Sequence, residues 1–357
     1  MNTSNQIGSK HISKNIFQLL TFLLLSILII SCNKSSERAE LFDLKIPLGL
    51  DSLTMFIPED NPLTIEKIKL GRKLFFDERL SVDGTVSCAT CHNPLLGFAD
   101  GRSVAVGIEG LEGPRSTPAI INRLFSQVQF WDGRAQSLEE QVLEPIENTI
   151  EMNNPLENVV KTLNADESIR NDFQKIFGTD VTVEGLQKAI ASFERILLSG
   201  ESSFDKYMAG DKKALSESAR NGFLLFKSEK VNCITCHKGT NFTDELFHNS
   251  GVGMDLEKPD LGRFVETKND TDYGRFKTPT LRDIARTSPY MHNGSLRSLS
   301  EVIDFYNRGG IRNDNLSIHI KPLNLTEEEK ENLIEFMRSL TGENPLSAGK
   351  NQSLGIN

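Results

Sequence analysis

The sequence predicts a mainly α protein built as two domains, with long loops and little β structure. After the capping residue Thr182 in the sequence, apolar residues recur at helical spacing, namely Leu186, Ile190, Phe193 and Leu197. Such a stripe is typical of core packing, and strand-like alternation is sparse. A chain of 357 residues is long enough for two domains that each bury a core. One cysteine motif also occurs twice, far apart in the chain.

The charge balance excludes one class of partner. The chain has 40 Lys+Arg against 49 Asp+Glu, a formal net charge of -9, and no Lys/Arg-rich run. Nucleic-acid binding depends on basic patches that face phosphates, so nucleic acid is not an expected partner. With 38% hydrophobic and 25% charged residues, the composition is that of an ordinary globular protein.

The N-terminal segment, residues 1–31, predicts export. Lys10 and Lys14 precede an apolar stretch of about 15 residues that ends just before Cys32, as in a signal peptide. Ile29-Ile30-Ser31-Cys32 resembles a bacterial lipobox, in which the cysteine becomes the lipidated first residue. The alternative is an ordinary signal peptide with a chance cysteine. Lipidation would anchor a periplasm-facing lipoprotein to a bacterial membrane, with residues 32–50 as a polar tether and a mature charge of -11.

The other four cysteines form two C-x-x-C-H motifs, Cys88-Ala89-Thr90-Cys91-His92 and Cys233-Ile234-Thr235-Cys236-His237. This is the attachment signature of c-type haem. Two cysteines three apart lie on one helical turn, so both thiols can reach the vinyl groups on one porphyrin edge, and the histidine can ligate the iron. A thioredoxin-like pair, disulfides or a four-cysteine zinc site are alternatives, but none needs that histidine. The sequence therefore predicts two covalent haems c.

The segments around the two motifs divide the chain into domains. A shared G-x-x-L-F core starts at Gly71 before the first motif and at Gly222 before the second. Each follows a polar-capped helix start, Leu63-Thr64 in one case and Leu215-Ser216 in the other, which is consistent with an internal duplication. We expect a first cytochrome c-like haem domain over residues 51–205 and a second over 206–345, followed by a flexible tail, 346–357. A capping box at Thr326 starts a last helix that ends before Gly342 and could pack back on the first domain. Long loops over 97–118 and 239–280 should line or cover a site.

The chain resembles the bacterial di-haem cytochrome c peroxidases and their relative MauG, the methylamine-utilisation maturation enzyme, from about Leu63 to Gly342. Besides the haem motifs, the blocks that carry the resemblance are Leu70-Gly71-Arg72-Lys73-Leu74-Phe75-Phe76-Asp77, Phe130-Trp131-Asp132-Gly133-Arg134, Phe276-Lys277-Thr278-Pro279-Thr280-Leu281-Arg282 and Pro289-Tyr290-Met291-His292-Asn293-Gly294.

The resemblance implies a peroxide pocket at the first haem. Its distal residues match Gln141, Pro145 and Glu151. Glu151 could act as the acid/base, since heterolysis needs one oxygen deprotonated and the other protonated, and burial would raise the pKa of its carboxyl. Gln141 would orient peroxide. Without the family register, both residues would be interpreted as surface residues.

Trp131 matches the tryptophan that lies between the two haems in this family, where it relays electrons; a lone tryptophan is otherwise more often core. Arg134, in the adjacent Asp-Gly-Arg turn, could bind a haem propionate, because a guanidinium pairs with carboxylates in a bidentate manner.

Two departures from the peroxidase pattern bear on the branch of the family. No histidine occurs between His92 and His237, so the first haem should be open without reductive activation, unless Met152 ligates it. The register also places Tyr306, as in MauG, where the peroxidases have a methionine as sixth ligand of the second haem. A tyrosinate lowers the haem potential. The rival ligands are Met254, Met291, His248 and His292, and Tyr306 could also be an ordinary helix tyrosine.

The resemblance further implies a structural calcium ion. Its carbonyl ligands would fall on Thr287 and Pro289, and Ser116 stands where the family has an asparagine. Calcium accepts carbonyl, hydroxyl and water oxygens, so serine or a water could replace the asparagine.

Taken together, these residues predict a peroxidase that reduces hydrogen peroxide to water. Electrons from a small c-type cytochrome or similar donor would enter at the second haem and pass by Trp131 to the first. One alternative is MauG-like oxidation of a partner protein's side chains through high-valent haem, and another is a non-catalytic electron carrier. A lipid anchor would be the membrane contact, the acidic surface would favour a basic donor, and a homodimer is left open.

Overall fold

The computed structural model describes residues 40–343 and Leu346, and from Leu41 onward the chain forms one compact unit. The predicted signal peptide, the lipobox-like Cys32 and the tail 347–357 lie outside the described residues. The prediction of lipidation is therefore not addressed by the fold.

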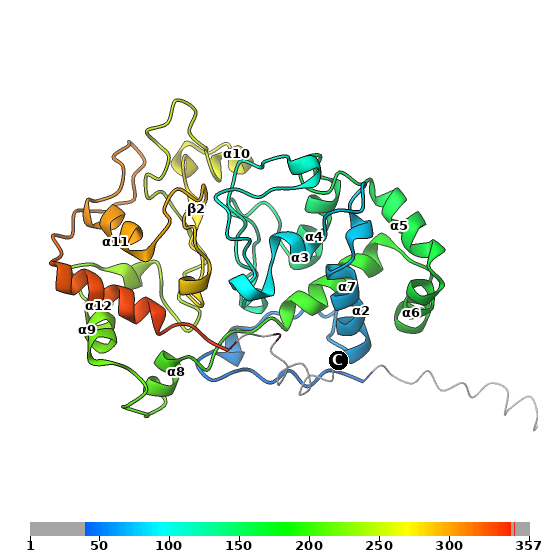
Figure 1. Ribbon diagram of the computed structural model, residues 1–357, viewed down its shortest axis with the longest axis horizontal. Helices are drawn as coiled ribbons and strands as arrows, with labels where there is room; N and C mark the ends of the chain where they lie inside the picture. Colours follow the sequence, from blue (N-terminus) through cyan, green and yellow to red (C-terminus); the bar gives the residue numbers. More distant parts are fainter. Residues whose placement is uncertain (1–39, 344–345, 347–357) are drawn as a thin grey trace, which may run out of the picture. The chain divides into compact units, whose positions relative to one another are not determined.

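The described part of the chain is mainly helical, with little β structure, as the sequence predicts (Figure 1). Strands β1 (Phe247–His248) and β2 (Phe276–Lys277) pair antiparallel and are two residues long each. The α-helices are α2 (Ile65–Phe75), α3 (Cys88–Cys91), α4 (Leu138–Glu147), α5 (Leu156–Ala165), α6 (Glu167–Phe177), α7 (Val183–Arg195), α8 (Ser203–Met208), α9 (Glu217–Phe226), α10 (Phe264–Thr267), α11 (Leu299–Asn307) and α12 (Glu327–Arg338).

Capping side chains set the starts of the long helices. Thr64 accepts a hydrogen bond from the backbone of α2, and Thr182 and Ser216 do the same for α7 and α9. Thr326 forms a capping box at the start of α12. A capping oxygen satisfies backbone N–H groups that the first helical turn leaves unpaired. The helix starts predicted at these four residues are confirmed.

Two separate apolar cores lie within the unit. The first draws on residues 63–197 and the second on residues 204–340. Figure 1 shows α2 and α4–α7 in one half, and α9, α11 and α12 in the other. The change from one core to the other falls between Leu197 and Phe204, slightly before the boundary expected at 205. Helix α12 packs on α9 and α11 of the second half. Leu346, which follows this helix in the chain, packs against the first core.

The two cores are built around the same helix contact. Gly71 of α2 approaches α7 so closely that an added Cβ would lie 1.9 Å from the carbonyl oxygen of Ala189. Gly222 of α9 meets α12 in the same way, with an added Cβ 1.8 Å from the carbonyl oxygen of Asn332. Only glycine permits so close an approach between helix backbones. The glycine of the G-x-x-L-F segment therefore makes the same close helix–helix contact in both halves, which supports the predicted duplication.

Residues 41–50 differ from the expected polar tether. Phe42 and Leu44 pack against the first core, and the amide of Phe42 donates to the carbonyl of Leu63. Further along, the carbonyl of Gly49 accepts from Nη2 of Arg282, 2.7 Å away. Burial of these apolar side chains stabilises the fold, so residues that pack on the first core already occur before residue 51, where the first domain is expected to begin.

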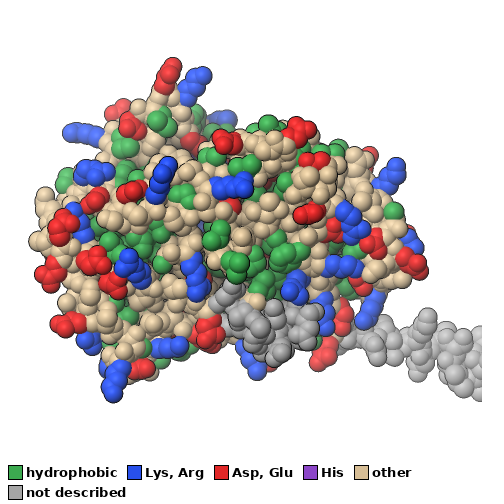
Figure 2. All heavy atoms as spheres, in the orientation of Figure 1, with side chains coloured by type: hydrophobic (Ala, Val, Ile, Leu, Met, Phe, Trp, Pro, Cys, Tyr) green, Lys and Arg blue, Asp and Glu red, His purple; other side chains and the backbone are tan. Residues whose placement is uncertain are grey.

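Charged side chains of both signs are interspersed over the face shown in Figure 2. Within the described residues, no helix is both long and apolar enough to cross a membrane.

Candidate functional site: two haem-attachment motifs and a distal pocket

The first motif forms one short helix that presents its histidine to a cavity. Ser87 caps α3, and its amide donates to Oγ1 of Thr90, 3.0 Å away. His92 ends the helix, and its Nδ1 lies 3.0 Å from the carbonyl oxygen of Phe98. A carbonyl can only accept, so Nδ1 carries the proton and Nε2 is left with its lone pair, the form that ligates iron. Burial lowers the pKa of His92, which favours this neutral form.

The second motif repeats the arrangement in a tighter turn. Cys233–Thr235 form a 3-10 helix, η6, and the carbonyl of Phe242 lies 3.0 Å from Nδ1 of His237. Burial also lowers the pKa of His237. The two histidines are therefore held in the same tautomer by the same kind of partner.

The cysteines and histidines of both motifs line cavities. A small cavity of about 50 Å³ contains Cys88, Cys91 and His92 in its wall. A larger one, of about 900 Å³, is lined by Cys91 and His92 and also by the cysteines and histidine of the second motif. The four cysteines form no disulfide among the described residues. Free thiols on one turn, a histidine with a free Nε2 and adjoining space are what a covalently attached haem requires, so the residues fit two haems c.

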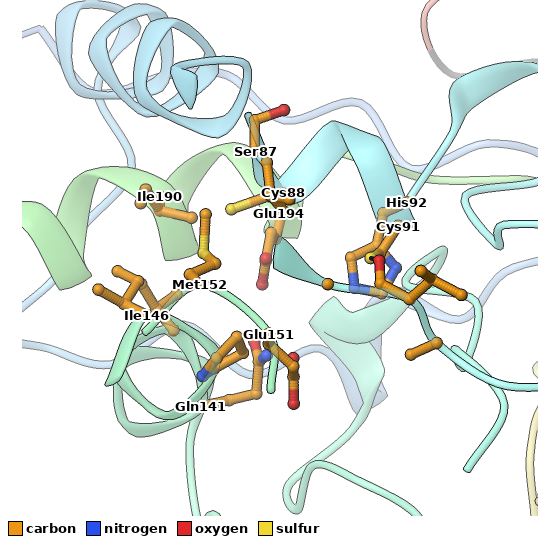
Figure 3. A pocket seen from close by; sticks show the side chains of 16 residues that line it. Ser87, Cys88, Cys91, His92, Gln141, Ile146, Glu151, Met152, Ile190 and Glu194 are labelled. Carbon is orange, nitrogen blue, oxygen red and sulfur yellow. Dashed lines mark hydrogen bonds between the residues drawn. The ribbon is translucent and has the colours of Figure 1, made fainter. Parts of the chain in front are cut away.

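The distal residues lie together in the small cavity. Three distal residues line the same cavity as His92. They are Gln141 on α4, Pro145 in the last turn of α4, and Glu151 just beyond that helix. Figure 3 shows the side chains of Gln141 and Glu151 entering the cavity from the side opposite the first motif. Met152, the rival sulfur ligand, also lines the cavity and is 3% exposed. The structure thus brings together the residues that the resemblance identified.

Glu151 has the environment of a proton-transfer group. Burial raises the pKa of its carboxyl, against the opposing effects of Arg134 and of a hydrogen bond from Asn148. That bond runs from Nδ2 of Asn148 to Oε1 of Glu151 over 2.8 Å and fixes one oxygen of the carboxyl. The other oxygen makes no hydrogen bond to a described side chain. A raised pKa brings the carboxyl closer to the range in which it can both accept and donate a proton.

Trp131 is hydrogen-bonded to both halves of the described chain at the larger cavity. Its Nε1 donates to the carbonyl oxygen of Ser116 over 2.8 Å, and its own carbonyl accepts from the amide of Lys277 over 2.7 Å. Ser116 belongs to the first half and Lys277 is part of β2. The ring is held by its Nε1 bond to Ser116, whereas the bond from Lys277 ties the backbone of Trp131 to β2. Trp131 lines the cavity that residues of both motifs also line.

Arg134 also lines the larger cavity, but its donors are largely taken. Its Nε donates to Glu144 over 2.5 Å and its Nη1 to Asp132 over 3.1 Å. The guanidinium stacks on the ring of Phe130, with 3.6 Å from its carbon to the ring centroid. The expected propionate contact therefore has at most the remaining Nη2 group to use.

Tyr306 and three of its four rivals line the larger cavity. Burial raises the pKa of Tyr306 to about 12, and the nearby thiols of Cys233 and Cys236 act in the same direction. His248 is held by Asp244, with 2.8 Å between Nε2 and Oδ2, and His292 stacks on Phe276. The lining rivals are Met291, His248 and His292, whereas Met254 is not part of the wall.

The three residues expected to hold calcium all border the larger cavity. The backbone of Ser116 is engaged, because its carbonyl accepts from Trp131 and its amide donates to the carbonyl of His292 over 2.7 Å. Oγ1 of Thr287 lies 3.3 Å from the carbonyl of Ile284. The carbonyls of Thr287 and Pro289 stay the expected calcium ligands.

Sequence reasoning missed the two carbonyls that orient the histidines. Phe98 and Phe242 share a positive φ, 61° and 50°, which turns each carbonyl towards its ring. The signal was present, since an F-x-D sequence follows both motifs, ending at Asp100 and Asp244. Alone, three residues are too few to predict a backbone conformation of this kind.

Comparisons with known proteins identify the family of the chain. A family model described as di-haem cytochrome c peroxidase matches residues 65–213. The methylamine utilization protein MauG of Methylophilus methylotrophus is 41% identical over 289 residues, 80% of this chain and 85% of the relative. The cytochrome c551 peroxidase of Nitrosomonas europaea is 35% identical over 287 residues, 80% of this chain and 82% of the relative. A crystal structure of a MauG-like protein associated with microbial copper homeostasis superposes with a TM-score of 0.78 at 32% identity, covering 87% of this chain and 97% of that one.

Relatives of 35–42% identity that cover 80% of the chain show the family directly. Haem c is the cofactor that this family implies, and both motifs are complete. The chain therefore belongs to the di-haem cytochrome c peroxidase family and is an oxidoreductase of the cytochrome c peroxidase type.

Proposed function

We propose that the protein reduces hydrogen peroxide to water at the first motif, with electrons from a small c-type cytochrome or a similar donor protein. The observation that carries the proposal is the shared cavity. Glu151, a carboxyl whose pKa is raised by burial, and the amide of Gln141 line the same small cavity as Cys88 and His92. An acid/base and a hydrogen-bonding group therefore face the attachment site from its distal side.

The chain's own residues divide the work at this site. When bound, the first haem supplies an iron that binds peroxide and transfers electrons into the O–O bond. His92 would hold that iron through Nε2, because the carbonyl of Phe98 occupies Nδ1. Glu151 would accept a proton from one oxygen of peroxide and return it to the other, which would leave as water. Asn148 keeps the carboxyl in place and Gln141 orients the peroxide.

The second motif serves electron entry. Trp131 lines the larger cavity; its ring N–H donates to the carbonyl of Ser116 and its backbone carbonyl accepts from the amide of Lys277. Its aromatic ring is the chain's candidate relay towards the first motif. Each reduction consumes two electrons and two protons per peroxide and yields two waters.

The wider organisation follows from the same proposal. Each core would serve one haem, the first over residues 51–205 and the second over 206–345, in line with the two apolar clusters. A calcium ion held by Ser116, Thr287 and Pro289 would stiffen the wall that they share. Lipidation at Cys32 would tether the enzyme, facing the periplasm, to a bacterial membrane.

A second candidate, MauG-like oxidation of side chains on a partner protein, is favoured by one residue. Tyr306 lines the larger cavity beside the second motif, where its phenol oxygen could bind the iron of a haem attached there. Burial raises the pKa of the free phenol, but the charge of a bound iron would favour loss of that proton and an anionic ligand. Such a ligand lowers the potential of the second haem and makes it a poorer acceptor for electrons from an ordinary cytochrome. The 41–42% identity to two MauG proteins agrees with this candidate.

Steady-state peroxide reduction with a reduced small c-type cytochrome tests the proposal. Fast turnover supports the peroxidase. Slow turnover with a long-lived oxidised form of the enzyme supports the second candidate. No reaction with peroxide would refute both and leave an electron carrier. A fully low-spin, six-coordinate oxidised protein would contradict the open first site.

A further inference from the structure

Glu194 is a buried carboxyl at the first motif that the proposed mechanism does not use. It lies near the end of α7, is 3% exposed and lines the small cavity together with Cys88 and Glu151. Figure 3 shows its carboxyl group directed into the cavity. Among the described residues, none donates a hydrogen bond to its Oε2. A buried carboxyl oxygen without a partner is costly, so its presence calls for an explanation.

The internal duplication provides a direct comparison for this position. In the first half an added Cβ on Gly71 would touch Phe193, and in the second half one on Gly222 would touch Phe336. The residues that follow these phenylalanines are Glu194 and Met337. Met337 is 6% exposed, belongs to the second core and lines the larger cavity, beside the second motif.

The same place in the fold thus carries an apolar side chain at one motif and a carboxyl at the other. Packing alone is satisfied by methionine, so the carboxyl at the first motif is not needed to build the helix pair.

The surroundings of Glu194 favour a group that can change its protonation state. Burial raises the pKa of its carboxyl to about 8, although Arg195 and Arg123 act in the opposite direction. Arg195 is itself bound to Glu139, over 2.6 and 2.8 Å, so it is not a dedicated counter-ion. The titratable and charged groups on the surrounding elements are Arg195 on α7, Arg123 on η5 (Arg123–Phe125), Glu139 on α4, Glu151 beyond α4, Lys67 on α2 and His92 of the first motif.

We propose that Glu194 is the proton-coupling group of the first haem. A carboxyl at this place takes up one proton from solvent when the iron gains one electron from the donor, since the added negative charge disfavours a second one nearby. It releases that proton when the iron gives up the electron. The overall balance is unchanged: hydrogen peroxide, two electrons and two protons give two waters. The inference rests on haem attachment at the first motif and not on peroxide turnover.

The test is a spectroscopic redox titration of the holoprotein between pH 6 and 9. One of the two midpoint potentials should fall with rising pH, with a slope approaching ~59 mV per pH unit, the value for a tenfold change in a one-electron equilibrium. Glu194→Met, which copies the second half, and Glu194→Gln should flatten that slope. Glu184→Gln is the matched control, because Glu184 is on the same helix with a side chain that is 74% exposed, and it should keep the slope.

Three results would overturn the proposal. The first is a slope that survives both Glu194 substitutions, and the second is wild-type protein with two potentials independent of pH. The third is a pH-dependent haem that proves to be the one whose spectrum responds to Tyr306→Phe. Should both variants fail to load haem, the reduced-minus-oxidised infrared difference spectrum of the wild type decides. A protonated carboxyl band must appear on reduction, and its absence would refute the coupling.

Discussion

Replacing Glu151 by Gln should lower kcat for peroxide reduction by ~10²–10⁴-fold, because an amide cannot accept and return a proton. Gln has nearly the same shape, and its amide oxygen can still accept the 2.8 Å hydrogen bond from Asn148. Folding and haem attachment should therefore be unchanged. At ~1.4 kcal/mol per tenfold, the loss corresponds to about 3–5 kcal/mol of activation free energy, all of it from proton transfer.

The pH profile gives a second readout of the same residue. Burial raises the pKa of Glu151 above its ordinary value of 4.5. The ionised carboxyl is the form that accepts the proton, so kcat/KM of the wild type should fall as the pH is lowered through this raised pKa. The sign follows from the direction of the shift: protonation sets in at a higher pH than for a free carboxyl. Glu151→Gln should lack this acidic limb.

The assay is steady-state oxidation of a reduced small cytochrome by peroxide, with the haem content of each variant measured first. Glu147→Gln is the control, since Glu147 is exposed at the end of α4, four residues before Glu151, and the change in charge is identical. The reasoning fails if Glu151→Gln turns over as fast as this control, or if it keeps the acidic limb.

Three further outcomes are expected. Tyr306→Phe should change the absorption spectrum and midpoint potential of one haem, because the phenol oxygen is lost as a ligand; identical spectra would remove Tyr306 from the iron. Replacing both cysteines of the second motif by Ala should reduce the mass of the denatured chain by one haem, and retention of two covalent haems would contradict the assignment. Gly71→Ala should cost ~1–3 kcal/mol or more, because the new Cβ would lie 1.9 Å from the carbonyl oxygen of Ala189. Thermal unfolding measures this, and Gly113→Ala, whose Cβ would meet its nearest atom at 3.5 Å, should be nearly neutral.

The duplication shows how far sequence patterns reach. The G-x-x-L-F segments identified equivalent helices, but the partners of Gly71 and Gly222 are α7 and α12, more than 100 residues further along the chain. The five-residue segments alone do not predict which helices these glycines contact. In the same way, the roles of Gln141 and Glu151 came from family resemblance, and the structure supplied the shared cavity that makes those roles chemically sensible.

The sequence by itself determined the haem-attachment motifs, the mainly α class and the starts of four long helices. Thiol spacing and helix capping are local, so a few neighbouring residues decide them. Tertiary structure alone decided which carbonyls orient His92 and His237, and that Phe42 and Leu44 of the expected tether pack on the first core. It also left Oε2 of Glu194 without a hydrogen-bond partner among the described residues, while the counterpart of Glu194 is a methionine. Burial and hydrogen-bond partners depend on segments far apart in the sequence, and only the folded chain brings those together.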